Sequence, residues 1–110
     1  MAAPLNLSEI DWNLVDQVLA LAPFGQGNAE PYFVLEKVVV LVAEKLTEGK
    51  HLRLILSNGR KDRKVMAFGF GQDLELTVGK TIDGLCRLGI NQWNGNKEIQ
   101  LTLIDYQIIS

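Results

Sequence analysis

The first periodic segment of the chain spans residues 8–22 and has the spacing of an amphipathic helix. Apolar residues recur there at steps of three and four and form one stripe: Ile10, Leu14, Val15, Val18, Leu19 and Ala22. Ser8 stands at the expected N-cap with Asp11 three residues later, and Leu7 and Trp12 have the spacing of a hydrophobic staple. Because proline cannot continue a helix, Pro23 ends the pattern.

Beyond Pro31 the apolar residues follow a period of two, which is typical of strands. Five segments show it: residues 32–46, 50–56, 63–70, 81–90 and 97–109. The first is long and rich in β-branched residues, and we expect it to bend. In the second, fourth and fifth segments the alternation predicts these inward-facing positions: Leu52, Leu54 and Leu56; Ile82, Gly84, Cys86, Leu88 and Ile90; Ile99, Leu101 and Leu103. The outward-facing positions include His51, Arg53 and Ile55, and Glu98, Gln100 and Thr102.

Polar segments separate the five predicted strands. Residues 47–50 form a turn, residues 57–62 and the Asn94-Gly95 pair carry the Asn-Gly signal of tight turns, and residues 71–80 form a longer connection with room for one helical turn. Five strands of this kind would leave apolar edges exposed unless the sheet closes. We therefore predict a mainly β protein: a five-stranded OB-fold-like barrel, residues 23–110, preceded by an N-terminal α-helix, residues 1–22, that packs on it.

The stretch LAPFGQGNAEPYF, residues 21–33, connects the predicted helix to the first strand. Gly25 and Gly27 allow tight backbone angles, and Phe24 supplies an apolar side chain for the core. Pro31 sets the direction of the strand. We interpret this connection as a structural link between the helix and the first strand, and not as a ligand-binding loop.

The composition fits one globular domain of 110 residues, of which 47% are hydrophobic. No apolar run in the sequence is long enough to span a membrane, and no signal-peptide pattern is visible. A single cysteine, Cys86, excludes an internal disulfide. Together these features favour a cytoplasmic protein without a membrane partner.

Charge is unevenly distributed along the chain, although the formal net charge is only −2. Residues 1–49 hold seven acidic and two basic residues, whereas residues 50–64 hold six basic residues and one acidic residue, Asp62. This central segment is either a solvated pair of strands or a patch that attracts a polyanion, because clustered cations gain from counterion release.

The sequence offers little for catalysis. His51 is the only histidine, Cys86 alternates with apolar residues, and no Cys/His spacing fits zinc. The acidic residues are scattered, and the GQG and GFG tripeptides are not followed by the helix that a phosphate-binding loop requires. We therefore expect no catalytic residues, no metal site and no cofactor in this chain.

The residue pattern is better suited to binding a single nucleic-acid strand. Cations that follow a phosphate backbone, together with an aromatic ring that stacks on a base, are how small barrels hold single strands. If the second and third strands pair, we expect their cations to form one surface, with the last hairpin nearby. The candidate residues are His51, Arg53, Arg60, Lys61, Arg63, Lys64, Asn91, Trp93 and Lys97.

Four stretches, LAPFGQGNAEPYF, GKHLRLIL, VMAFGF and CRLGINQWNGNKEIQLTLIDYQI, follow one another in a distinctive order from about Leu19 to Ile108. In order and spacing they resemble the C-terminal OB domain of RecJ-type single-stranded-DNA-specific exonucleases. The resemblance implies a domain that binds single-stranded DNA for a separate catalytic core. That core would use Mn²⁺ or Mg²⁺, bound by aspartates and histidines, to degrade the strand from its 5′ end.

The resemblance also implies roles for particular residues. It places DNA contacts on Lys50, His51 and Arg53 and on the hairpin of residues 91–97. The chain has no Asp-His-His motif, so nothing metal-binding carries over. The resemblance does not imply DNA contacts for the cations of residues 60–64, which are included as candidates because of their charge alone.

Three functions remain open at this stage. The preferred one is a module that binds single-stranded DNA, with a RecJ-type catalytic core as a further partner. The alternative is a protein-interaction module without nucleic-acid binding, which would use exposed apolar residues such as Ile55, Ile104 and Ile109. A complete small enzyme is disfavoured because no residue set could hold its metal.

Overall fold

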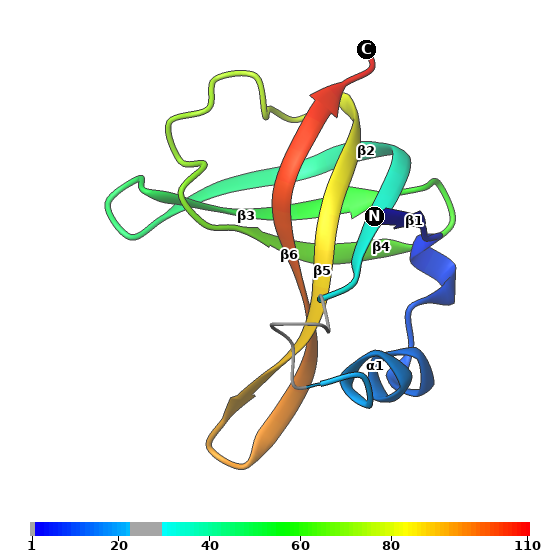
Figure 1. Cartoon of the computed structure of the whole chain (residues 1–110). Helices are drawn as coiled ribbons and strands as arrows, with labels where there is room; N and C mark the ends of the chain where they lie inside the picture. Colours follow the sequence, from blue (N-terminus) through cyan, green and yellow to red (C-terminus); the bar gives the residue numbers. More distant parts are fainter. Residues whose placement is uncertain (1, 23–29) are drawn as a thin grey trace.

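The computed structural model describes residues 2–22 and 30–110. Each of the five predicted strands is present in it (Figure 1). In chain order the elements are β1 (Ala2–Pro4), the 3₁₀ helix η1 (Leu7–Glu9), α1 (Trp12–Leu19), β2 (Tyr32–Leu46), β3 (His51–Ser57), β4 (Asp62–Ala67), β5 (Thr81–Trp93) and β6 (Asn96–Ile108).

Strands β2 to β6 close into a barrel. β3 pairs antiparallel with β2 and β4, β5 pairs antiparallel with β2 and β6, and β6 pairs parallel with β4. The order β2-β3-β4-β6-β5 returns to β2, which removes the free edges of these five strands. The predicted mainly β, OB-fold-like barrel is therefore confirmed.

The alternation of apolar residues produces a core inside this barrel. The buried hydrophobic residues of β3, β5 and β6 all lie at predicted inward positions: Leu52, Leu54, Leu56, Ile82, Cys86, Leu88, Leu101 and Leu103. Ile90 and Ile99 are only half-buried. They lie where the β5–β6 hairpin extends beyond the barrel, so fewer neighbours cover them (Figure 1).

The β2 strand bends, as its length predicts. Its register with β5 shifts between Leu35 and Val38, and Lys37 within this bulge has a φ of +51°. The backbone N–H of Lys37 donates to Asp83 Oδ1 at 2.8 Å, which satisfies a donor that leaves the ladder. Because of this bend, the first half of β2 pairs with β5 and the second half with β3.

The N-terminal segment differs from the single helix that the sequence predicts. Asn6, and not Ser8, is the first cap: its side chain accepts from the Ser8 N–H at 2.8 Å and forms a capping box with Glu9. Asp11 then caps α1 by accepting from the Leu14 N–H at 2.8 Å. Two capping residues so close together interrupt the helix and leave a 3₁₀ turn in front of it.

The hydrophobic staple moves with the start of α1. The two positions that flank the Asp11 cap in a staple are Ile10 and Val15, and both are buried. Trp12 is instead 42% exposed. α1 packs against β5, and β1 adds a short parallel strand to β2, which the sequence does not indicate.

The predicted boundary between helix and barrel stays a prediction. The connection assigned to Phe24, Gly25 and Gly27 lies outside the described residues.

The connection between β4 and β5 consists of turns and contains no helix. The Gly71 N–H donates to the carbonyl oxygen of Lys50 at 3.1 Å, which holds the connection against the β2–β3 turn. Leu76 is buried in the core, whereas Leu74 and Val78 are 85% and 64% exposed. This loop therefore closes one end of the barrel while presenting apolar side chains to solvent.

Cys86 is expected to be chemically inert in the folded protein. Burial raises the pKa of its thiol to about 12, so almost no thiolate is present at pH 8. A disulfide reagent that releases a coloured thiol should leave the folded chain unmodified at pH 8 and modify one cysteine per chain once guanidinium unfolds it. Rapid modification of the folded chain would contradict the buried position of Cys86.

Candidate nucleic-acid interface

The ten residues predicted to contact nucleic acid fall into three groups in the fold. The first begins at the β2–β3 turn, the second lies at the other end of the β3–β4 ladder, and the third lies on the projecting β5–β6 hairpin (Figure 1). The groups are Lys50, His51 and Arg53; Arg60, Lys61, Arg63 and Lys64; and Asn91, Trp93 and Lys97.

In the first group, local contacts hold the side chains of His51 and Arg53. His51 Nδ1 accepts a hydrogen bond from the Gly69 N–H at 2.8 Å, and its ring meets Phe68 edge to face at 5.5 Å. Arg53 Nη1 lies 3.8 Å from Glu44 Oε1 in an exposed ion pair. Because exposed pairs of this kind contribute little free energy, a phosphate can compete for the Arg53 guanidinium.

The basic β3–β4 turn is attached to the N-terminal segment through Asn58. Its Oδ1 accepts from the backbone N–H groups of Arg60 and Lys61 at 2.9 and 2.8 Å. Its Nδ2 donates to Asn6 Oδ1 at 2.9 Å. The backbone of the turn is thereby fixed, while the side chains of Arg60 and Lys61 are exposed.

Arg63 and Lys64 point to opposite faces of β4. Arg63 pairs with Leu56 on the inner side, and its Nη2 donates to the carbonyl oxygen of Ile10. Its Nε is buried and has no hydrogen-bond partner among the described residues. Lys64 pairs with Ile55 on the outer side. Alternation along a strand separates neighbouring side chains, yet Lys61, Arg63 and Lys64 all line one cavity beside β4.

Lys64 connects β4 to the last hairpin. Its Nζ donates to Glu98 Oε1 at 2.7 Å, and Glu98 pairs in register with Asn91. The hydrogen bond from Lys64 holds the pKa of the Glu98 carboxyl below its ordinary value, against a smaller opposing effect of burial. The ion pair brings the second and third groups together.

The tip of the β5–β6 hairpin has the geometry that its sequence predicts. Asn94 and Gly95 have φ angles of +47° and +77°, as a two-residue type I′ turn requires. Trp93, which pairs with Asn96 at the base of the turn, is 45% exposed. Its ring is available for stacking on a base.

The strand register adds one cation that was not among the predicted site residues. Arg53 pairs with Met66, Met66 with Thr102, and Thr102 with Arg87, so one row crosses four strands. Arg87 is exposed. The inward positions of its neighbours in β5 already imply that it points outward. We term Arg53, Lys64 and Arg87 the cationic face.

Thr102 shows how this row is packed. It stays on the outer side, as the alternation predicts, yet only 6% of it is exposed. It pairs with Met66 and Arg87 in the neighbouring strands, and its Oγ1 accepts a hydrogen bond from Gln100 Nε2 at 3.5 Å.

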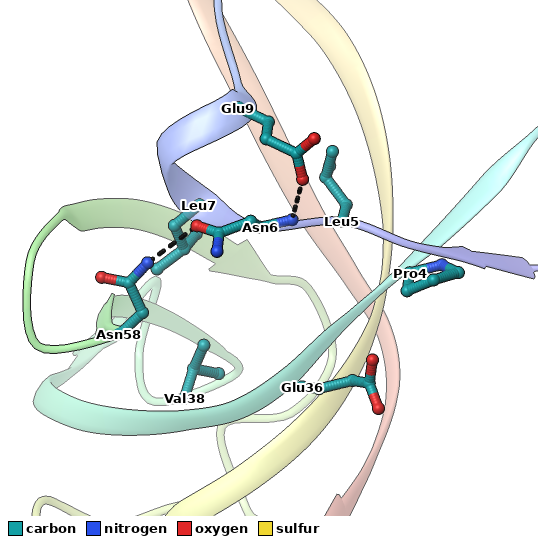
Figure 2. A pocket seen from close by; sticks show the side chains of 8 residues that line it. All are labelled: Pro4, Leu5, Asn6, Leu7, Glu9, Glu36, Val38 and Asn58. Atoms are coloured by element: carbon teal, nitrogen blue, oxygen red, sulfur yellow. Dashed lines mark hydrogen bonds between the residues drawn. The ribbon is translucent and has the colours of Figure 1, made fainter.

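A small cavity on another side of the barrel is unsuited to a polyanion. It has a volume of about 300 Å³ and lies between the N-terminal segment and β2 (Figure 2). Asn6 lies between Glu9 and Asn58 and is hydrogen-bonded to both. The ionisable side chains lining it, Glu9 and Glu36, are acidic, so it would repel phosphate.

A second cavity, of about 650 Å³, lies between the start of α1 and the strands β4 and β6. It brings Lys61, Arg63, Lys64 and Lys97 together with the exposed ring of Trp12. The sequence pattern assigns Trp12 to helix packing, so its place beside these cations was not predicted.

Within residues 2–22 and 30–110, no group of three or more histidine, cysteine, aspartate or glutamate side chains could hold a metal ion. No helix in this part of the chain is long and apolar enough to cross a membrane.

Comparison with known proteins gives consistent matches. Residues 1–105 match the sequence model of a protein family, the RecJ OB domain. The single-stranded-DNA-specific exonuclease RecJ of Bacillus subtilis is 26% identical over 102 residues, which is 91% of this chain and 13% of the relative. RecJ of Thermus thermophilus is 35% identical over 89 residues, which is 81% of this chain and 12% of the relative.

Solved structures match in the same way. The crystal structure of Thermus thermophilus RecJ in complex with Mn²⁺ aligns with a TM-score of 0.62 and 27% identity, covering 86% of this chain and 14% of that one. The corresponding Mg²⁺ complex aligns with a TM-score of 0.63 and 25% identity, covering 89% and 15%. The chain thus spans about an eighth of the curated relatives that it matches.

Proposed function

The chain belongs to the RecJ OB domain family, and on this basis we propose that it binds single-stranded DNA and presents the strand to the catalytic part of a RecJ-type exonuclease. The observation that carries the proposal is the cationic face, together with the exposed ring of Trp93 at the tip of the β5–β6 hairpin. The relatives carry single-stranded-DNA specificity in their names, which supports the same ligand.

The proposed contacts divide into phosphate and base contacts. Arg53, Lys64 and Arg87 meet phosphates, and Trp93 stacks on a base. The row from β3 to β5 crosses three strand spacings, or about 14 Å, which suits a few nucleotides of an extended strand. No base-specific hydrogen bonds are needed, so binding should tolerate different sequences.

Cleavage is assigned to the catalytic part and not to this chain. The two similar structures are of RecJ in complex with Mn²⁺ and with Mg²⁺. We propose that such metal chemistry takes place outside the OB domain and that this domain needs no cofactor of its own. The proposed setting is DNA repair and recombination in the cytoplasm.

Binding of a labelled oligothymidylate should depend on salt. Three phosphate contacts at about 0.7 each give a slope near −2 in the logarithm of affinity against the logarithm of salt. Between 50 and 200 mM salt the affinity should therefore fall about twentyfold. Fluorescence anisotropy measures this, with a duplex of equal length as the weaker-binding control. No binding at low salt, or binding indifferent to salt, would overturn the proposed function.

A second candidate function is favoured by the apolar loop between β4 and β5. Leu74 and Val78 line a hollow of about 360 Å³ with Leu52, far from the basic β3–β4 turn. Of the apolar residues suggested by the sequence, Ile109 is exposed and Ile55 and Ile104 are half-buried. We propose that this loop contacts the rest of a RecJ-type polypeptide. An association with a RecJ-type catalytic fragment that survives 1 M salt, and is lost in Leu74→Ser, would support it.

A further inference from the structure

We propose that the cavity between α1, β4 and β6 holds one nucleotide, with its base stacked on Trp12 and its phosphate between Lys61 and Lys97. This inference rests on the proposed binding of single-stranded DNA and adds a second base-binding position to it. The position is distinct from Trp93, which pairs with Asn96 at the tip of the hairpin and does not line the cavity.

The exposure of Trp12 is not explained by packing. Trp12 is the first residue of α1, whose buried side is formed by Val15 and Val18. A tryptophan that leaves 42% of its surface exposed beside a cavity offers a flat apolar ring to a ligand. Nucleobases stack on such rings regardless of their sequence.

The charges around the cavity favour one phosphate and not a long polyanion. Its lining has four cations and three carboxylates, those of Asp11, Asp62 and Glu98. Asp11 caps α1 and Glu98 pairs with Lys64, so Asp62 is the carboxylate that opposes an anion. Lys61 and Lys97 have exposed side chains, and neither forms an ion pair within the described residues. They are the cations available to a phosphate.

Arg63 acts here as a positioning residue. Its hydrogen bond to the carbonyl oxygen of Ile10 ties β4 to the segment that leads into Trp12. Asn58 fixes the backbone of Lys61 in the adjoining turn. These two contacts position the segment that leads into Trp12 and the backbone of Lys61 before a ligand binds.

The sequence contains two tryptophans, so each can be observed alone. In a Trp93→Phe variant the only indole is that of Trp12, and base stacking should quench its fluorescence when oligothymidylate is added. Inorganic polyphosphate, which has charge but no bases, should bind without comparable quenching. If anisotropy shows that the oligonucleotide binds while Trp12 fluorescence stays unchanged, the nucleotide position is wrong although the proposed function stands. If the oligonucleotide does not bind at all, both fail.

Substitutions give a second measurement that does not depend on fluorescence. Trp12→Leu should weaken oligonucleotide binding about tenfold, whereas Trp12→Phe, which keeps an aromatic face, should retain most of the affinity. The pair Lys61→Gln and Lys97→Gln should weaken binding and reduce the salt slope by about 0.7, the contribution of one phosphate contact. Equal affinities for Trp12→Leu and Trp12→Phe would overturn stacking at this position.

Discussion

Replacing Arg53, Lys64 and Arg87 together by glutamine should weaken binding of single-stranded DNA about hundredfold at 0.1 M salt. Each phosphate contact contributes about 0.7 to the salt slope, so losing three removes about 2 from it. Extrapolated from 1 M salt, where this contribution vanishes, a slope change of 2 corresponds to about two orders of magnitude at 0.1 M. Anisotropy titrations at several salt concentrations give both the affinity and the slope.

A matched control separates position from total charge. The triple variant Lys37→Gln, Lys45→Gln and Lys80→Gln makes the same change in net charge at exposed residues outside the cationic face. This control variant should keep the salt slope of the parent protein, and its affinity for single-stranded DNA should fall only slightly. If both triple variants lose affinity equally, attraction would depend on net charge, and the cationic face would have no special role.

The strands and their inward residues were predictable because one physical rule generates both. A barrel with a single core requires alternation, and Leu52, Leu54 and Leu56 display it without exception. The same rule applied to charged residues would have separated Arg63 from Lys64 and found Arg87. A cluster of charges along the sequence does not indicate which face of the sheet each charge lies on, because neighbouring residues in a strand face opposite sides.

Other features depend on contacts between distant segments and have no local signal. The parallel pairing of β4 with β6, seen at Val65 and Leu101, follows from barrel closure and not from either strand alone. The start of α1 was misplaced because Ser8, Asn6 and Asp11 are all good capping residues, and local spacing does not rank them. The exposure of Trp12 beside Lys61 could also be found only from the tertiary structure. When the start of the helix shifts by a few residues, a residue predicted to pack against the core becomes exposed.

Gly71→Ala should destabilise the fold by about 2 kcal/mol, which lowers Tm by roughly 10 °C. A Cβ atom at this position would lie 1.8 Å from the carbonyl oxygen of Gly49 and 2.6 Å from the carbonyl carbon of Lys50. Both atoms belong to backbone, so no flexible side chain can move aside. The loop must instead leave the β2–β3 turn and lose the hydrogen bond from Gly71 to Lys50. Urea or thermal unfolding followed by circular dichroism measures the loss.

Gly89→Ala is the matched control for this clash. Among the described residues, no atom outside its two chain neighbours lies within 4 Å of a Cβ built on Gly89, and its φ is outside the left-handed region. Its substitution should therefore leave stability unchanged or raise it by about 0.5 kcal/mol, because alanine restricts the unfolded chain. Equal stability of the two variants would mean that the loop does not rest on the β2–β3 turn. In that case the hydrogen bond from Gly69 to His51, which depends on the same loop, could not fix the imidazole at the edge of the proposed DNA path.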